Sequence, residues 1–531
     1  MSENFLQTAG PQSVLSKLFK RVPKYITVTF AVAFILCVLV HHQAYSKMLL
    51  NLDNLGHMFG SDYGVMSGRW LLPAVLGLEG DLCISWIIGL IAAFFLSLSV
   101  CITVSLTRIR SAVGCIAVAA IMTTFPMIAS NNFYMFSADA YMFSLFLACL
   151  GAYLTVKYRF GFIPGCACMV LSAGIYQAFL GAGAALLVGS LIFELLDGEK
   201  SAWEVFKKGV GFAMTLAAAM VVYYIIVKLT SKSTGLVDYE GISSMGFESL
   251  KALRWTAVWA FVYDFKFFIK DGMNLHSAAA VVAFVLMMVA AFIMVLSVIR
   301  RRSLGWKKVA LLMFLLVCFF LAANLTRLTA PDAGIHMLMI YGVCLVPVAA
   351  VALGDYVYSM REAREAKGPS VKLDTACVWI VVCSAVILSA NYAIKDNEVY
   401  FKSEIVEREA VTYSNRMLSA VQQAEGYEAG MPLVIVGRKS IGPIETKGLE
   451  NISMTGCFEM DSVIRCYTYD RFLRYYCGWT DEVIMEEYAD NPNTAVSYAA
   501  MDEVRDMPVY PDQGSVRVID GAVVVKMSEP N

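Results

Sequence analysis

Blocks of about 17 to 22 apolar residues alternate with short polar stretches along most of the chain. A helix rises 1.5 Å per residue, so a block of that length crosses a hydrocarbon core of about 30 Å. The run from Phe160 to Leu196 is about 55 Å long as a helix and is therefore divided near Gly174. We predict about eleven membrane-spanning helices, at residues 25–42, 84–106, 111–129, 138–156, 160–174, 178–196, 210–229, 277–298, 309–325, 337–355 and 375–394.

Lys and Arg gather in alternate short loops, and such loops favour the cytoplasm. The opposite short loops carry no Lys or Arg except Arg327. An odd number of helices then places the N-terminus inside and the C-terminus outside. We expect a cytoplasmic segment at residues 1–24, a membrane domain at 25–394 and an extracytoplasmic domain at 395–531.

The polar tail has the length of a small domain. Residues 397–426 are helix-like, whereas residues 432–436 and 515–526 resemble strands, so a small α/β domain is expected. The tail has three cysteines, Cys457, Cys466 and Cys477. If the tail faces an oxidising compartment, two of them could form a disulfide.

Composition supports a multi-pass membrane protein, since 58% of residues are hydrophobic and 16% are charged. The net charge of −1 and the lack of a basic stripe argue against nucleic-acid binding. Walker A and GxGxxG loops are absent, and the five histidines show no metal-ligand spacing. No cofactor is indicated with certainty, and a divalent metal stays open.

Candidate chemistry begins in the first outer segment, which is dense in charged residues. Glycosyl transfer needs a carboxylate to accept the acceptor's proton and a cation to stabilise a leaving phosphate, and Asp53 with Arg69 supplies both. Ordinary solvated loop charges, with Trp70 as an interface anchor, are the competing interpretation. The ionisable candidates of this segment are Asp53, His57, Asp62, Arg69, Glu79 and Asp81.

Other candidates lie at the outer ends of later helices. Asp139 is a functional candidate because an acid at a span entrance is costly, although a first-turn acid favoured by the helix dipole is the alternative. Tyr176 and Gln177 could bind sugar hydroxyls or form a plain turn. Arg327 could hold a lipid phosphate or extend to lipid headgroups, with His336 as a loop neighbour.

The second outer segment contains SLKALRWTAVWAFVYDFKFFIKDG, in which aromatic and basic residues are mixed. This pattern is typical of a helix that lies in the membrane interface. Such a helix could guide a lipid-linked substrate or only anchor the loop.

Taken in order, LDN and SGRW in the first outer loop, SADAYMFSLFLACLGAYL, GIYQAFL and the loop with Arg327 resemble the bacterial glucosyl transferase II family. These O-antigen-type enzymes belong to the multispanning GT-C glycosyltransferases, and the likeness covers roughly residues 25–395. Where the family has a pair of acids this chain has Asp53 and Asn54, so the second carboxylate is missing and Asp62 is a possible substitute.

The resemblance implies transfer of glucose from a polyprenyl-phosphate donor to a surface glycan outside the bacterial inner membrane, by a single inverting displacement. Asp53 would be the general base, Arg69 and Arg327 would contact phosphate, and Asp139 and Gln177 would line the sugar site. A companion flippase and a donor synthase would be partners, together with membrane lipid. One alternative is a flippase or other transporter of lipid-linked sugars, although transporters more naturally carry ionisable residues within their spans. Another alternative is a noncatalytic assembly partner.

Overall fold

The structure is a computed structural model of the 531-residue chain. It describes residues 12, 16, 20–59, 67–76, 80, 82–234, 247–330, 334–362, 369–438, 448–464, 467–486 and 497–529. Several residues considered above lie outside this part of the chain, namely Asp62, Glu79, Asp81 and Cys466.

The chain folds as two compact units. The helical unit comprises Met1–Lys47 and Ser61–Asn397, and the C-terminal unit comprises Met48–Gly60 and Glu398–Asn531. The segment that carries Asp53 therefore packs with the tail, far away in sequence, rather than with the helices on either side of it.

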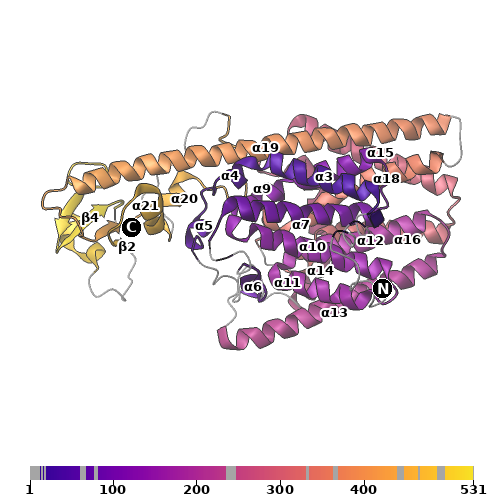
Figure 1. The fold of residues 1–531 in the computed structure, drawn as a ribbon, viewed down its shortest axis with the longest axis horizontal. Coiled ribbons are helices and arrows are strands. Elements are labelled where there is room, and N and C mark those ends of the chain that lie inside the picture. Colours follow the sequence, from indigo (N-terminus) through magenta and orange to yellow (C-terminus); the bar gives the residue numbers. More distant parts are fainter. Residues whose placement is uncertain are drawn as a thin grey trace. The chain divides into compact units, whose positions relative to one another are not determined.

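Helices make up the helical unit (Figure 1). Within the described residues, nine helices are long and apolar enough to cross a membrane, so the chain is a membrane protein. Two shorter apolar helices, α3 and α11, coincide with expected spans, and the number eleven stays a prediction. The larger helices are α3 (Lys24–Val40), α7 (Ser85–Leu106), α8 (Ala112–Thr124), α10 (Ala138–Lys157), α11 (Phe162–Ile175), α12 (Leu180–Leu196), α13 (Ala202–Thr234), α14 (Phe247–Ile269), α15 (Ala278–Arg301), α16 (Trp306–Ala323), α18 (Leu345–Glu362) and α19 (Pro369–Gln422).

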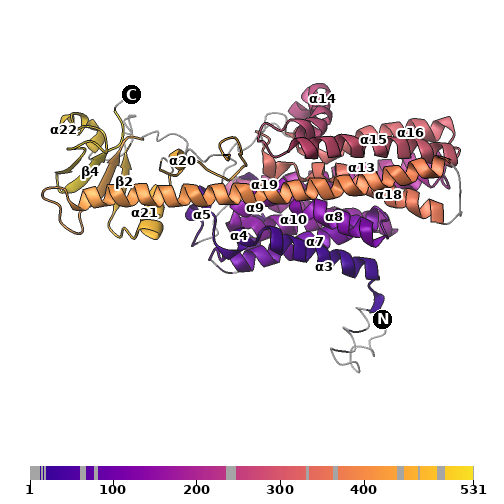
Figure 2. The ribbon, with the colours of Figure 1, turned by 90° about the horizontal axis from the view of Figure 1, so that it is seen from above.

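Short elements fill the connections between these helices. In Figure 2, α14, α15 and α16 lie on one side of the helical unit, and α3 and α7 lie on the other. The short elements are α4 (His42–Ser46), α6 (Leu72–Leu76), α9 (Pro126–Phe133), α17 (Leu325–Thr329) and the 3-10 helices η2 (Met135–Ser137), η3 (Gln177–Phe179), η5 (Met337–Met339) and η6 (Tyr341–Cys344).

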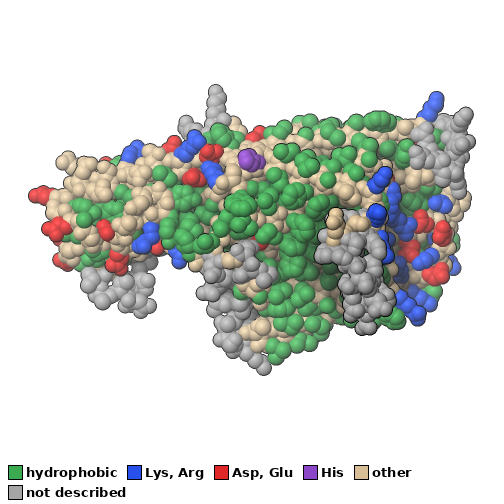
Figure 3. Space-filling model, in the orientation of Figure 1, with side chains coloured by type: hydrophobic (Ala, Val, Ile, Leu, Met, Phe, Trp, Pro, Cys, Tyr) green, Lys and Arg blue, Asp and Glu red, His purple; other side chains and the backbone are tan. Residues whose placement is uncertain are grey.

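Basic side chains gather at one end of the helical unit, beside a broad hydrophobic surface (Figure 3). Contacts between loops tie this end together: Arg108 pairs with Asp197, and Lys308 donates to the Gly198 carbonyl at 2.6 Å. Loops without basic clusters pack together away from this end, for example η3 with η5 and with α17. The candidate residues of the helical unit belong to those loops.

The C-terminal unit is a small α/β fold with a four-stranded sheet in the order β2-β1-β4-β3. Strand β1 (Leu433–Val436) pairs in parallel with β2 (Val483–Glu486) and with β4 (Ala522–Lys526), and β3 (Val516–Ile519) pairs antiparallel with β4. The run 515–526 is thus a hairpin, and β2 was not predicted.

The helix expected at residues 397–426 does not begin there. It is the second part of α19, which continues unbroken from the last apolar span to Gln422. A hydrophobic core joins the end of α19, the sheet, α20 (Met460–Ile464) and α21 (Tyr469–Cys477). It also includes Leu55 of α5 (Leu52–Gly56) and Leu50, which precedes α5. The unit is completed by the 3-10 helix η7 (Tyr498–Ala500) and by α22 (Asp502–Arg505). Cys457 and Cys477 are not bonded to each other.

Candidate functional site

Arg69 is the centre of a buried polar site in the helical unit. Its side chain is only 6% exposed, and one guanidinium nitrogen donates to the Tyr141 hydroxyl at 3.0 Å. The guanidinium carbon lies 4.8 Å from the centre of the Tyr176 ring, and the rings of Tyr141 and Tyr176 stack with centroids 4.5 Å apart. Two aromatic rings therefore hold a permanent positive charge in one orientation.

Two neighbouring elements, η3 and α13, fix the loop that carries Arg69. The Gln177 amide nitrogen donates to the Ser67 carbonyl at 3.3 Å and to the Tyr223 hydroxyl at 2.7 Å, and that hydroxyl donates to the Gly68 carbonyl at 3.2 Å. Gly68 has φ of +75°, a conformation that glycine adopts without a Cβ penalty. The sequence left open whether Gln177 binds a sugar or forms a plain turn, and in the structure its amide positions the loop.

Trp70 follows Arg69 and packs against α11. The Leu71 amide donates to the Gly174 carbonyl at 2.9 Å, and a Cβ at Gly174 would lie 2.6 Å from Cε2 of Trp70. Only glycine leaves room for the indole at this point, so the end of α11 fixes the position of Trp70 and, through it, of Arg69.

Gly174→Ala should therefore displace Trp70 and lower both stability and activity. Overpacking of this kind costs about 1–3 kcal/mol, and the expected result is a lower melting temperature together with reduced activity. Gly189→Ala is the matched control in α12, because its Cβ would lie an ordinary 3.7 Å from the Phe319 ring. Equal melting temperatures and activities for the two variants would contradict this description of the Trp70 contact.

His336 lies close to the same site. Burial, and then the charge of Arg69, lower the pKa of His336 to about 4, so its imidazole is neutral at neutral pH. Asp139 is 5% exposed in the first turn of α10, two residues before Tyr141. Since η3 packs against both η5 and α17, the loops that carry Gln177, His336 and Arg327 meet in one region.

Arg327 lies beside a buried acid that sequence analysis did not select. Its guanidinium carbon is 4.1 Å from the centre of the Tyr263 ring. The next residue, Asp264, is 1% exposed on the buried face of α14. Its signal in the sequence is the spacing of Ala260, Asp264, Phe267 and Phe268, which places a lone acid on the apolar face of a helix.

The loop between α14 and α15 is held to α19 by further buried polar groups. Asp271 pairs with Nδ1 of His276, whose Nε2 lies 3.0 Å from the Tyr392 hydroxyl. The Asn391 amide nitrogen donates to the Leu275 carbonyl at 2.7 Å. These contacts, also missed by sequence analysis, fix the end of α14 and hence the position of Asp264.

Asp53 lies in the C-terminal unit, half-buried in the first turn of α5. Its Oδ1 accepts a hydrogen bond from the Tyr467 hydroxyl at 2.9 Å. Asn51 caps α5 by accepting from the Asp53 amide at 2.8 Å, and its own amide nitrogen donates to the Gly456 carbonyl at 3.1 Å. The tail therefore orients the carboxylate that sequence analysis selected as the base.

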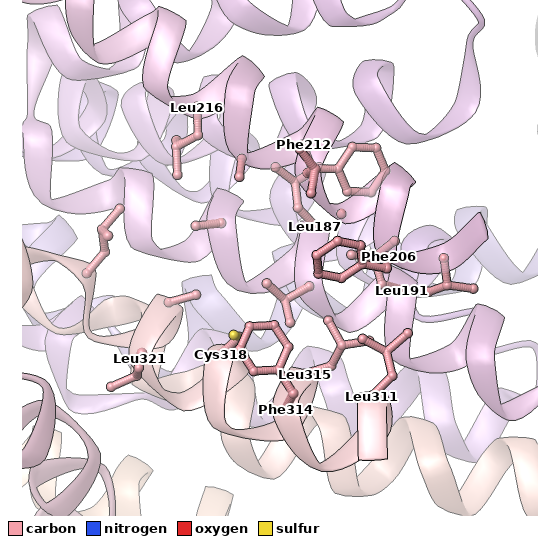
Figure 4. A pocket seen from close by; sticks show the side chains of 18 of the residues that line it. Leu187, Leu191, Phe206, Phe212, Leu216, Leu311, Phe314, Leu315, Cys318 and Leu321 are labelled. Atoms are coloured by element: carbon pink, nitrogen blue, oxygen red, sulfur yellow. The ribbon is translucent and has the colours of Figure 1, made fainter. Parts of the chain in front are cut away.

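An apolar groove of about 380 Å³ runs between α12, α13 and α16 (Figure 4). Its walls carry no charged side chain, and they include Leu187, Phe212 and Leu315. Leu325 and Leu328 of α17 also line the groove, so it reaches the short helix that carries Arg327. Its shape and chemistry suit a hydrocarbon chain.

Within the described residues, no group of three or more His, Cys, Asp or Glu side chains could hold a metal ion.

Comparison with known proteins gives one family: residues 43–347 match the family model described as glucosyl transferase GtrII. The match covers more than half of the chain. No curated protein and no solved structure gives a significant match.

Proposed function

The chain belongs to the GtrII glucosyl transferase family, and from this premise we propose that it transfers glucose from a polyprenyl-phosphate donor to a surface glycan. Membership makes the chain a glucosyltransferase with a sugar donor and an acceptor. The proposal adds that the donor is lipid-linked and that the reaction takes place on the extracytoplasmic face of the bacterial inner membrane. A flippase and a donor synthase would then supply the substrate.

The observation that carries the proposal is the fixed positive charge of Arg69 at the end of the helical unit opposite the basic loops. Breaking the bond between glucose and phosphate leaves negative charge on the phosphate oxygens. A guanidinium held in advance by Tyr141 and Tyr176 stabilises that charge without having to reorient. The basic loops favour the cytoplasm, which supports an extracytoplasmic position for Arg69.

In the proposed reaction, Asp53 is the general base. An acceptor hydroxyl oxygen attacks the anomeric carbon of glucose while the bond from that carbon to the phosphate oxygen breaks. The hydroxyl proton passes to the Asp53 carboxylate, and polyprenyl phosphate leaves with the bonding electron pair. Because the nucleophile enters opposite the leaving group, the anomeric configuration inverts. The Tyr467 hydroxyl bond holds Asp53 in one orientation.

The apolar groove supports a lipid-linked donor, because an isoprenoid chain could lie between α12, α13 and α16. Val210→Trp should fill part of the groove and raise the KM for the donor by about tenfold. Val210 lines the groove and is 44% exposed, so the larger ring does not need to enter the protein core.

Val221→Trp is the matched control for this test. Val221 lies on the same helix and is 59% exposed, but it does not line the groove. Its KM should equal that of the wild type when initial rates are measured over a range of donor concentrations. An unchanged KM for Val210→Trp would remove the groove from the donor site.

The proposed function as a whole is tested by comparing the surface glycan of cells with and without this protein. Mass spectrometry and linkage analysis should show the loss of a glucose branch and return of the branch on complementation. Glycans that remain identical in composition and linkage would contradict the proposal.

A further inference from the structure

The strongest unexplained feature of the helical unit is the carboxyl group of Asp264. It is 1% exposed, and neither oxygen has a hydrogen-bond partner of normal geometry in the part of the chain that the structure describes. A buried polar group without a partner costs about 1–3 kcal/mol. A cost of that size indicates that the group serves a ligand or a reaction.

Arg327 is the cation whose charge acts on the carboxyl group of Asp264. Its Nε is also buried without a hydrogen-bond partner among the described residues, and no ion pair within 4.0 Å joins it to Asp264. Asn324 lies at the start of α17, and its amide nitrogen donates to the Ala260 carbonyl at 3.4 Å. An acid, a guanidinium and an amide thus converge between α14 and α17, with no ion pair and no hydrogen bond of normal geometry to the acid.

Burial keeps Asp264 in its neutral form. It raises the pKa of the carboxyl to about 8, against the opposing effects of the Arg327 charge and the Asn324 amide. A neutral carboxylic acid donates one hydrogen bond, as a carboxylate does not. At neutral pH, Asp264 is therefore a hydrogen-bond donor, and the charge of Arg327 stays available to an anion.

We propose that Asp264, as a neutral acid, and Arg327 together bind the phosphodiester of a lipid-linked sugar. Arg327 supplies the charge, the Asp264 hydroxyl donates to one phosphate oxygen, and Tyr263 holds the guanidinium in place. The apolar groove ends at the same short helix, so a phosphate bound there would have its hydrocarbon chain beside Leu325 and Leu328. This inference rests on the proposed lipid-phosphate donor and names a residue of its binding site.

Few other charged groups face Asp264. Helices α15, α16 and α17 pack against α14. Of their ionisable side chains, Arg327 acts on the carboxyl, Cys318 lies in the span of α16, and the other basic side chains of α15 and α16 lie at the far ends of those helices. Lys266 of α14 and Lys270, which follows its last residue, are exposed. The pKa of Tyr263 is raised by burial, so it stays neutral where Asp264 ionises.

The test measures binding of farnesyl methyl phosphate, a phosphodiester with one permanent negative charge, to the purified full chain in nanodiscs. If only the protonated acid binds, the affinity of the wild type should fall about tenfold between about pH 6.5 and about pH 9. Asp264→Asn keeps a donor but does not ionise, so it should bind with near wild-type affinity at the lower pH and show no fall. Asp264→Leu should bind about tenfold or more weakly at the lower pH.

Equal affinity of the wild type at both pH values, or the same fall in Asp264→Asn, would overturn the inference. The probe carries no sugar, so the result is independent of catalysis. If the probe binds as predicted but no glucose is transferred from polyprenyl-phosphate-glucose, the anion site is supported and the proposed function is refuted. If glucose is transferred but probe binding does not depend on pH, the proposed function is supported and the anion site is refuted.

Discussion

Asp53→Asn should lower the rate of glucosyl transfer by about 10²–10⁴-fold, the range that a general base contributes. The amide has the shape of the carboxylate but does not accept the acceptor's proton. Donor binding and melting temperature should stay at wild-type values, because the amide oxygen still accepts from Tyr467. Transfer by purified protein, measured alongside donor binding, separates loss of chemistry from loss of binding.

Two further variants complete the test of the base. Asp470→Asn changes another acid of the C-terminal unit, in the first turn of α21, and should leave transfer unchanged. Asp62→Asn examines the other carboxylate that the sequence offers. Full activity of Asp53→Asn together with loss of activity in Asp62→Asn would move the base assignment to Asp62.

Arg69→Lys should lower kcat/KM by about 10²–10³-fold, even though the positive charge is kept. Lysine lacks the planar fork that binds phosphate oxygens in pairs, and its flexible stem loses the orientation set by Tyr141 and Tyr176. Steady-state kinetics in detergent or nanodiscs, with a melting curve for each variant, measures the effect.

Tyr141→Phe is the graded control for Arg69. It removes the hydroxyl that accepts from the guanidinium and keeps the stacked ring, so a smaller loss of about tenfold is expected. Arg254→Gln, on the exposed surface of α14, should not change the rate. An Arg69→Lys enzyme as active as the wild type would show that the buried guanidinium does not act on the phosphate.

Much of the helical unit could be predicted because membrane-spanning helices follow from local composition. The apolar blocks predict the positions of the long helices, and GIYQAFL and SGRW contain candidate site residues. The bonds of Gln177 to Ser67 and Tyr223 could not be predicted, because they join segments that are distant in sequence.

The same reason explains what was missed. Packing of residues 48–60 with the tail depends on contacts such as Asn51 with Gly456, which no local pattern reveals. The strand β2 is short and is stabilised by its partner β1. Asp264 was overlooked because the aromatic residues around it suggested an interfacial helix, and Trp255 and Trp259 are indeed 61% and 60% exposed. The opposite face of that helix holds the acid.

The most direct test of the central claim is transfer by the purified chain alone. Radiolabelled polyprenyl-phosphate-glucose and the isolated surface glycan would be supplied to protein in nanodiscs, with the Asp53→Asn protein as the blank. The proposed function predicts that label moves to the glycan and that the new linkage has inverted anomeric configuration. A glycan that stays unlabelled with intact donor and folded protein would contradict it.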